Sequence, residues 1–166
     1  MRLHRLIAVA ALGAAALSAG GAQAQGLITT HRIAAALANE AVGAAVAACA
    51  QKGYAVSAVL VDVDGVRQAM ERGDNAGIHT IDGAQDKAFT AASLKTDTSA
   101  IEARFKSTPA PSILAKLPHL ILSAGGLVIK IGDEVIGAMG VSGAPGGEKD
   151  EACGHAGLDM IKDRLK

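Results

Sequence analysis

Two β-hairpin signals constrain the fold of this chain more than any other feature. The run YAVSAVLVDVDG is rich in β-branched residues and ends at Asp64-Gly65, and VRQAMERG follows as the returning strand. The run LVIKIGDEVIGAMGVSG has the same form and turns at Gly132-Asp133. Such pairs between two apolar runs are typical of a tight turn, and strands joined in this way are antiparallel. The sequence therefore predicts an antiparallel sheet.

Segments with helical periodicity lie before, between and after the two hairpins. The predicted helices begin at Thr29 or Thr30 and run to about Gln51, then span about Ala76 to Leu94, Thr96 to Lys106, and Gly147 to the C-terminus. This order of helix, hairpin, helices, hairpin and helix predicts an α+β fold. Neither a repeat nor a linker divides residues 25–166, so we expect them to form one domain.

The first residues have the pattern of an export signal. MRLHR is basic, LIAVAALGAAALSA is apolar but too short to favour a membrane span, and AQA at residues 22–24 fits a small-residue cleavage site. We therefore expect residues 1–24 to be a signal peptide. The mature protein, residues 25–166, is then expected to be periplasmic or secreted, without a membrane span.

The mature chain is close to neutral and poor in aromatic residues. Loss of Arg2 and Arg5 with the signal leaves 14 basic residues against 16 acidic ones. The chain has no basic stripe of the kind that binds nucleic acid, so no nucleic-acid partner is expected. With no Trp, one Tyr and two Phe, the core must be built from Ala, Val, Ile and Leu. Surfaces of small residues approach one another closely, which favours compact packing or self-association.

The two cysteines, Cys49 and Cys153, have no metal-ligand spacing. In an oxidising compartment they can pair as a disulfide. Cysteine is also among the most buried residue types, so two buried thiols explain the same residues. The sequence leaves both alternatives open.

The segments AGIHTIDGAQDKAFTAAS and AGGLVIKIGDEVIGAMGVSGAPGGEKDEACGHAGL are the most distinctive parts of the chain. Together with the order of elements, they resemble the GlcG/HbpS-like haem-binding family, which includes the C-terminal domain of PduO-type cobalamin adenosyltransferases. The likeness covers about residues 28–166. It departs from the family where Gly125-Gly126 is followed by Leu127-Val128, since members often have Gly-Gly-x-Pro there.

The resemblance implies a profilin-like or PAS-like sandwich, with a central antiparallel sheet of about five strands flanked by helices. It also implies haem as a cofactor, and homo-oligomers that are dimers or larger. In such a sandwich the two terminal helices pack side by side on one face of the sheet. If they are antiparallel, Cys49 near the end of one helix approaches Cys153 near the start of the other.

Four residues are candidates to bind the cofactor. His79 shares a helix face with Asp82 and Asp86, so its imidazole can ligate iron while a carboxylate holds its other nitrogen. The alternative is a solvated polar face. Lys87 lies in the best-matched segment and can pair with a haem propionate, or it is an exposed cation that pairs with Asp86. The full set of cofactor-binding candidates is His79, Lys87, Thr90 and His119.

His119 and His155 have weaker patterns. His119 follows Pro118 at the edge of an apolar run, a position also typical of a structural histidine. His155 shares a face with Glu151 and Asp159 on the last predicted helix. Imidazole and carboxylate groups suit many divalent metals, although a solvated face is the alternative. The metal-ligand candidates are His79, His155 and Glu151, whereas His31 is expected on the surface.

The run VIGAMGVSGAPGGEKDE is a bare loop between a strand and a helix start. It contains neither a phosphate-binding nor a dinucleotide-binding glycine pattern, and Glu148, Asp150 and Glu151 already place negative charge at the helix start. We interpret it as a tight packing corner that can also wall a pocket. No catalytic set is present in the sequence, and no catalytic residue is predicted.

Three functions fit these observations. The first is an exported protein that binds haem or another tetrapyrrole for binding, sensing or sequestration. The second is an enzyme that degrades haem or handles peroxide. The third is an oligomeric accessory protein without a cofactor.

Overall fold

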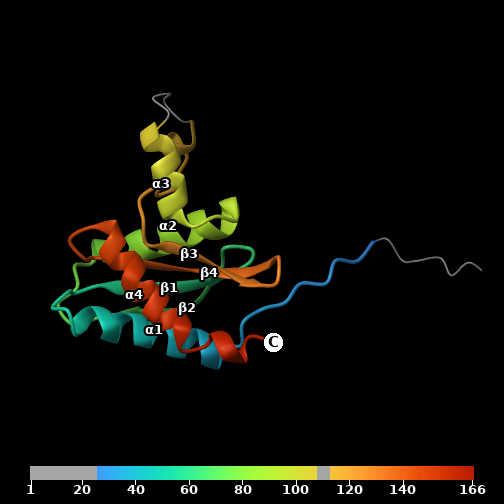
Figure 1. The fold of residues 1–166 in the computed structure, drawn as a ribbon, viewed down its shortest axis with the longest axis horizontal. Helices are drawn as coiled ribbons and strands as arrows, with labels where there is room; N and C mark the ends of the chain where they lie inside the picture. Colours follow the sequence, from blue (N-terminus) through green and yellow to red (C-terminus); the bar gives the residue numbers. More distant parts are fainter. Residues whose placement is uncertain (1–25, 108–112) are drawn as a thin grey trace, which may run out of the picture.

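The computed structural model describes residues 26–107 and 113–166, so the predicted signal peptide lies outside the described residues. A four-stranded antiparallel sheet forms the centre, with helices on both faces (Figure 1). The elements are α1 (Ala35–Ala50), β1 (Ser57–Asp62), β2 (Arg67–Arg72), α2 (His79–Leu94), α3 (Thr98–Ser107), the 3-10 helix η1 (Ile113–Lys116), β3 (Gly126–Ile131), β4 (Glu134–Ser142), α4 (Gly147–Asp159) and the 3-10 helix η2 (Lys162–Arg164).

Both predicted hairpins are present, and the α+β class is confirmed. The strand order is β2-β1-β4-β3, with β1 and β4 pairing in the centre. The expectation of about five strands is wrong, because the described residues form four. The apolar run before β3 does not join the sheet. Its Ile121 donates its backbone N–H to the Thr90 hydroxyl at 2.9 Å, so this hydrogen bond is made to a helix side chain and not to a strand.

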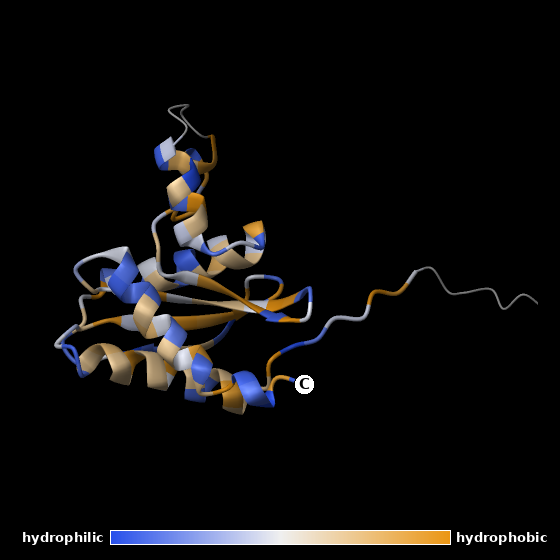
Figure 2. Cartoon of the chain, in the orientation of Figure 1, coloured by the Kyte–Doolittle hydropathy of each residue, from blue (hydrophilic) through white to orange (hydrophobic). Residues whose placement is uncertain are grey.

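The two faces of the sheet are covered differently. Helices α1 and α4 lie side by side on one face, α2 lies on the other, and α3 projects away from the body (Figure 1). Strands β1, β3 and β4 are largely hydrophobic, whereas the edge strand β2 is mostly polar (Figure 2). The core under α1 and α4 contains large side chains such as Leu60, Ile136 and Met139. The core under α2 is built mainly from Val and Ala. Within the described ranges, no helix combines the length and the apolar character needed to cross a bilayer.

Helix α2 rests almost directly on the sheet backbone. A Cβ at Gly140 would lie 2.0 Å from the Ala84 carbonyl oxygen, and one at Gly126 would lie 2.4 Å from the Lys87 carbonyl oxygen. Only glycine permits so close an approach of helix and strand. The glycine-rich run is therefore a packing corner, as the sequence indicates, and a cofactor has no room between α2 and these strands.

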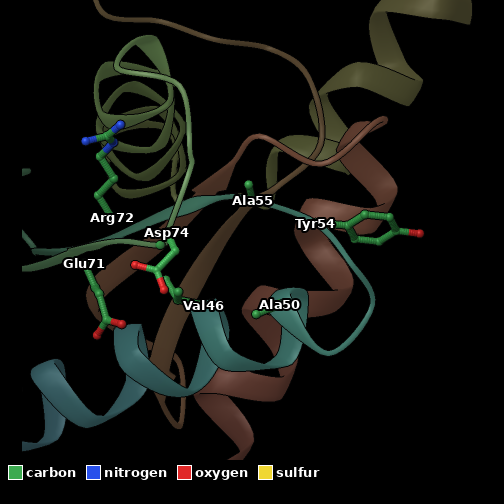
Figure 3. Close-up of a pocket in the computed structure, with 8 residues that line it drawn as sticks. Val46, Ala50, Tyr54, Ala55, Glu71, Arg72 and Asp74 are labelled. Carbon is green, nitrogen blue, oxygen red and sulfur yellow. The ribbon is translucent and has the colours of Figure 1, made fainter.

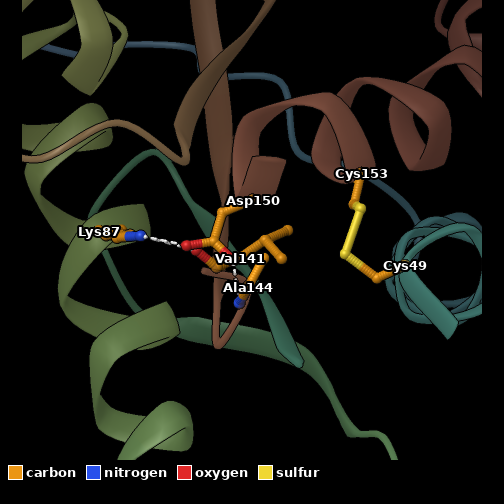
Figure 4. The surroundings of a disulfide bond; sticks show 6 residues. All are labelled: Cys49, Lys87, Val141, Ala144, Asp150 and Cys153. Atoms are coloured by element: carbon orange, nitrogen blue, oxygen red, sulfur yellow. Dashed lines mark hydrogen bonds and ion pairs between the residues drawn. A yellow bond between two sulfur atoms is a disulfide. The ribbon is translucent and has the colours of Figure 1, made fainter. Parts of the chain in front are cut away.

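Helices α1 and α4 run in opposite directions along the same face of the sheet (Figure 1), and a disulfide between Cys49 and Cys153 joins them (Figure 4). The two Cα atoms are 5.5 Å apart, within the range that a disulfide requires. Both residues are fully buried. Of the two alternatives left open by the sequence, the structure has the disulfide.

The first helix starts later than predicted, at Ala35 and not near Thr29 or Thr30. The residues before it are held by long-range contacts instead. The backbone N–H and Nδ1 of His31 both bind the Glu134 carboxylate, and Ile33 is buried in the core. Tertiary contacts of this kind override a local capping signal.

Candidate functional site

An exposed histidine from the segment between η1 and β3 lies against α2, where a carboxylate of that helix holds it. His119 Nδ1 lies 3.2 Å from Asp86 Oδ1, and the His119 side chain is 72% exposed while that of Asp86 is 23% exposed. Among the described residues, none hydrogen-bonds to His119 Nε2. The pair therefore presents an oriented imidazole with one nitrogen available to a ligand.

A second contact, one helical turn along α2, fixes the segment that carries His119. The Thr90 hydroxyl accepts the backbone N–H of Ile121 at 2.9 Å and donates to the Asp86 carbonyl oxygen at 2.6 Å. Thr90 is fully buried, so it holds this segment in place from beneath. His119 itself has a φ of 63°, in the left-handed region that few non-glycine residues adopt.

Phe89 lies beside this pair and borders a hollow. Its ring is 6.5 Å from the His119 ring, centroid to centroid, in an edge-on arrangement. Gly65 of the β1–β2 turn lies against the same ring, because a Cβ there would be 2.7 Å from Phe89 Cδ2. The hollow has about 480 Å³ of empty space and is lined by Val63, Asp64, Gly65, Phe89, Ala92, Ser93 and Lys95.

Lys87, a predicted cofactor-binding residue, is buried and already paired. Its Nζ lies 2.8 Å from Asp150 Oδ2 and also donates to the Val141 carbonyl oxygen at 3.1 Å (Figure 4). The alternative of an exposed cation beside Asp86 is wrong, because Lys87 is 5% exposed. Burial raises the pKa of Asp150, and the hydrogen bond from Lys87 opposes that shift. The pair joins α2 to the start of α4.

The other predicted residues lie apart from one another. His79 is exposed at the first residue of α2, and Asp86, seven residues further along, binds His119 instead. His155 Nε2 lies 3.9 Å from Glu151 Oε1, which accepts a hydrogen bond from Ser99. Within residues 26–107 and 113–166, no three His, Cys, Asp or Glu side chains gather as a metal site would require. The metal-ligand set predicted from the sequence is not brought together as one cluster.

Size does not distinguish the hollow at Phe89 from others on the surface. A hollow beside the end of α1, lined by Val46, Ala50, Tyr54, Ala55, Glu71, Arg72, Gly73 and Asp74, has about 470 Å³ of empty space (Figure 3). Its Arg72 points away from Glu71 and Asp74 and donates to the Ala76 carbonyl oxygen, and Tyr54 also points outward. Its polar groups do not converge on one point. The hollow at Phe89 differs because an oriented imidazole lies beside it.

Sequence reasoning missed the contact of Phe89 with His119, and it grouped Asp86 with His79 although the Asp86 carboxylate binds His119. Asp86 and Phe89 are three residues apart on α2, so they share a face, and that spacing was a usable signal. The contact with His119 joins residues 33 apart in the chain, and no local pattern reports such a contact.

Comparisons with known proteins agree over most of the chain. The model of the family described as "Haem degrading protein HbpS-like" matches residues 33–159. A double mutant of HbpS from Streptomyces reticuli is 31% identical, with a TM-score of 0.76, and the match covers 95% of this chain and 99% of that one. No curated protein matches the chain.

Two further solved structures have the same fold. Klebsiella pneumoniae protein ORFY is 28% identical, with a TM-score of 0.73, and the match covers 81% of this chain and 94% of ORFY. A PduOC:haem complex is 22% identical, with a TM-score of 0.72, and the match covers 79% of this chain and 96% of PduOC. The family match and the identity to HbpS confirm the resemblance identified from the sequence. This chain is a member of the HbpS-like family.

Proposed function

We propose that the protein binds haem or a related tetrapyrrole, with His119 as a ligand of the iron. The Asp86–His119 pair is the observation that carries the proposal. A ligating imidazole commonly gives its other ring N–H to a carboxylate, which fixes its orientation and raises its basicity. Histidine is a common haem ligand. Nδ1 of His119 binds Asp86, and its other ring nitrogen, Nε2, belongs to an exposed side chain.

The residues around His119 fit a flat, mostly apolar ligand. Phe89 offers an aromatic ring beside the imidazole, and Leu117, two residues before His119, is 46% exposed. The family description names haem degradation, and the PduOC structure is a haem complex, so similar proteins support the same ligand class. Bound haem would supply a redox-active iron with a strong Soret absorption. The protein would orient it through His119 and Asp86.

In this proposal the protein acts outside the cytoplasm in haem binding, sensing or sequestration. The Cys49–Cys153 disulfide supports export, because disulfides persist in oxidising compartments. Intact-mass measurement of protein from the native host tests this, and a mass that retains residues 1–24 would contradict it. We also propose self-association, with a symmetric dimer as the basic unit. Light scattering that gave a monomer mass at micromolar protein would contradict that.

Hemin titration of the purified protein, followed by the Soret band, tests the main proposal. Wild-type protein should give a saturable spectrum, and His119→Ala should lower the affinity by about tenfold or more, as for loss of a metal-site partner. His31→Ala is a matched control, because His31 is also exposed and its Nδ1 lies 2.8 Å from a carboxylate oxygen of Glu134.

Two outcomes would contradict this site. An unchanged titration for His119→Ala would exclude it as the ligand, and loss of the spectrum in His79→Ala instead would move the site to the start of α2. An equal loss in His31→Ala and His119→Ala would show that the spectrum reports surface histidines in general.

Haem degradation is the second candidate function, because the family description names it. Incubation of the haem-loaded protein with a reductant and oxygen tests it. Loss of the Soret band at a rate above that of free hemin would support an enzyme. A Soret band that stays stable with a large molar excess of reductant over protein would support a binding protein.

A further inference from the structure

Phe89 connects the exposed histidine to the hollow on α2. Its ring is edge-on to the His119 ring. Phe89 also lines the hollow, together with Ala92, Ser93 and Lys95. The β1–β2 turn closes over the ring at Gly65, where a side chain would collide with it. A flat molecule with its centre at His119 would therefore extend along Phe89 toward the hollow.

Lys95 is an available cation at the rim of that hollow. It is exposed, and among the described residues no carboxylate lies within ion-pair distance of its Nζ. Among the described residues that line the hollow, the one carboxylate is that of Asp64, which lies 2.6 Å from Arg32 Nη2. Lys87, the other lysine on this helix, is buried against Asp150 and cannot reach the surface. The charge that the hollow offers to an anion is that of Lys95.

The backbone conformation at Lys95 is unusual for a lysine. Lys95 ends α2 with a φ of 53°, in a conformation in which helices usually place glycine. Of the described residues, three that are not glycine have positive φ, namely Asn75, Lys95 and His119. Two of these three are neighbours of the Phe89 site: the His119 ring contacts the Phe89 ring, and Lys95 lines the same hollow as Phe89. Residues in such sparsely populated backbone conformations cluster at ligand sites.

We propose that the hollow beside Phe89 receives the carboxylate side of the tetrapyrrole, and that Lys95 makes the protein prefer carboxylate-bearing tetrapyrroles over their esters. This inference rests on the proposed function. Lys95 is a specificity-determining residue in this scheme, because its ammonium group attracts a propionate without contacting the iron. His119 binds the iron of either ligand, whereas Lys95 distinguishes between them.

Titrations with hemin and with hemin dimethyl ester, in the same mild detergent, test the proposal. Wild-type protein should bind hemin more tightly than the ester. Lys95→Gln should weaken hemin binding by about two- to fivefold, the range for an exposed charge pair, and leave the ester unchanged. Lys95→Arg should retain the preference. Lys52→Gln, which removes an exposed lysine that follows α1 on the other side of the sheet, should change neither titration.

The outcomes separate this inference from the proposed function. His119→Ala should weaken both ligands equally and keep their ratio. If wild-type protein binds hemin but Lys95→Gln leaves the hemin-to-ester ratio unchanged, the Lys95 assignment is wrong while haem binding stands. If wild-type protein binds neither ligand, the proposed function is wrong and this inference is lost with it.

Discussion

Two adjacent residues of α2 form ion pairs with opposite characters. Asp86 faces outward to His119, whose side chain is 72% exposed. Lys87 faces inward to Asp150, and these two side chains are 6% and 4% exposed. The inner pair has lost its water, so each charge depends on the other. The outer pair keeps its water and leaves an imidazole accessible. Neighbouring positions on one helix thus serve the stability of the fold and the candidate site separately.

The inner pair is also tied to its surroundings. Lys87 donates to the Val141 carbonyl oxygen at the end of β4, and Asp150 Oδ1 accepts the Ala144 N–H at 2.9 Å. The ammonium and the carboxylate therefore hold the glycine-rich loop between β4 and α4. A change at either residue should disturb the whole corner.

Breaking the inner pair should have the largest effect on stability. Lys87→Met leaves the Asp150 carboxylate buried without a charged partner, and removal of one member of a buried pair costs about 3–5 kcal/mol. The double change Lys87→Met with Asp150→Leu should recover most of that loss. Denaturant unfolding measures both. A loss below about 1 kcal/mol in the single variant would remove the contrast with the outer pair.

Removing the disulfide should come next. Cys49→Ala with Cys153→Ala should lower the free energy of unfolding by about 2–5 kcal/mol, because the bond closes a long loop in the unfolded chain. Thermal or denaturant unfolding with and without reductant checks this. Reductant should lower the unfolding midpoint of the wild-type protein, because it cleaves the buried disulfide when the chain unfolds. It should leave the midpoint of the double variant unchanged. Two free thiols per chain in denatured, unreduced protein would contradict the bond itself.

The sequence predicted what local chemistry decides and left open what long-range packing decides. The turns at Asp64-Gly65 and Gly132-Asp133 were readable because turn residues act on their own neighbours. The partner of Lys87 lies 63 residues away, and a helical periodicity does not identify it. The apolar run after Pro118 is also held by a distant residue, because Ile121 in it donates its backbone N–H to Thr90 on α2. The disulfide likewise depended on how two terminal helices pack.

Gly65 allows a matched test of how Phe89 is held. Gly65→Ala and Gly132→Ala both place a side chain at positive φ, 79° and 57°, which costs about 1 kcal/mol. Only the former meets Phe89, since a Cβ at Gly132 has no neighbour within 4 Å. We expect Gly65→Ala to cost about 1–3 kcal/mol more than Gly132→Ala in denaturant unfolding. Equal losses would show that the turn does not support the ring.

Breaking the outer pair should have the smallest effect on stability. Asp86→Asn should change the free energy of unfolding by at most about 1 kcal/mol, since exposed charge pairs contribute little. It should nevertheless reduce hemin affinity by about tenfold, because the His119 imidazole loses the carboxylate that orients it. Unfolding and hemin titration on the same variant measure the two effects. A stability loss as large as that of Lys87→Met would show that both pairs are structural.

The covalent link between α1 and α4 also determines how the molecule transmits mechanical force. The bond joins residues 104 apart, and all four strands and α2 lie between them. A pull applied at Ala35 and Asp159 passes from α1 to α4 through the sulfur atoms and bypasses the sheet. Under tension only the short stretches outside the bridge can extend, and the surface that carries His119 and Lys95 remains unstretched.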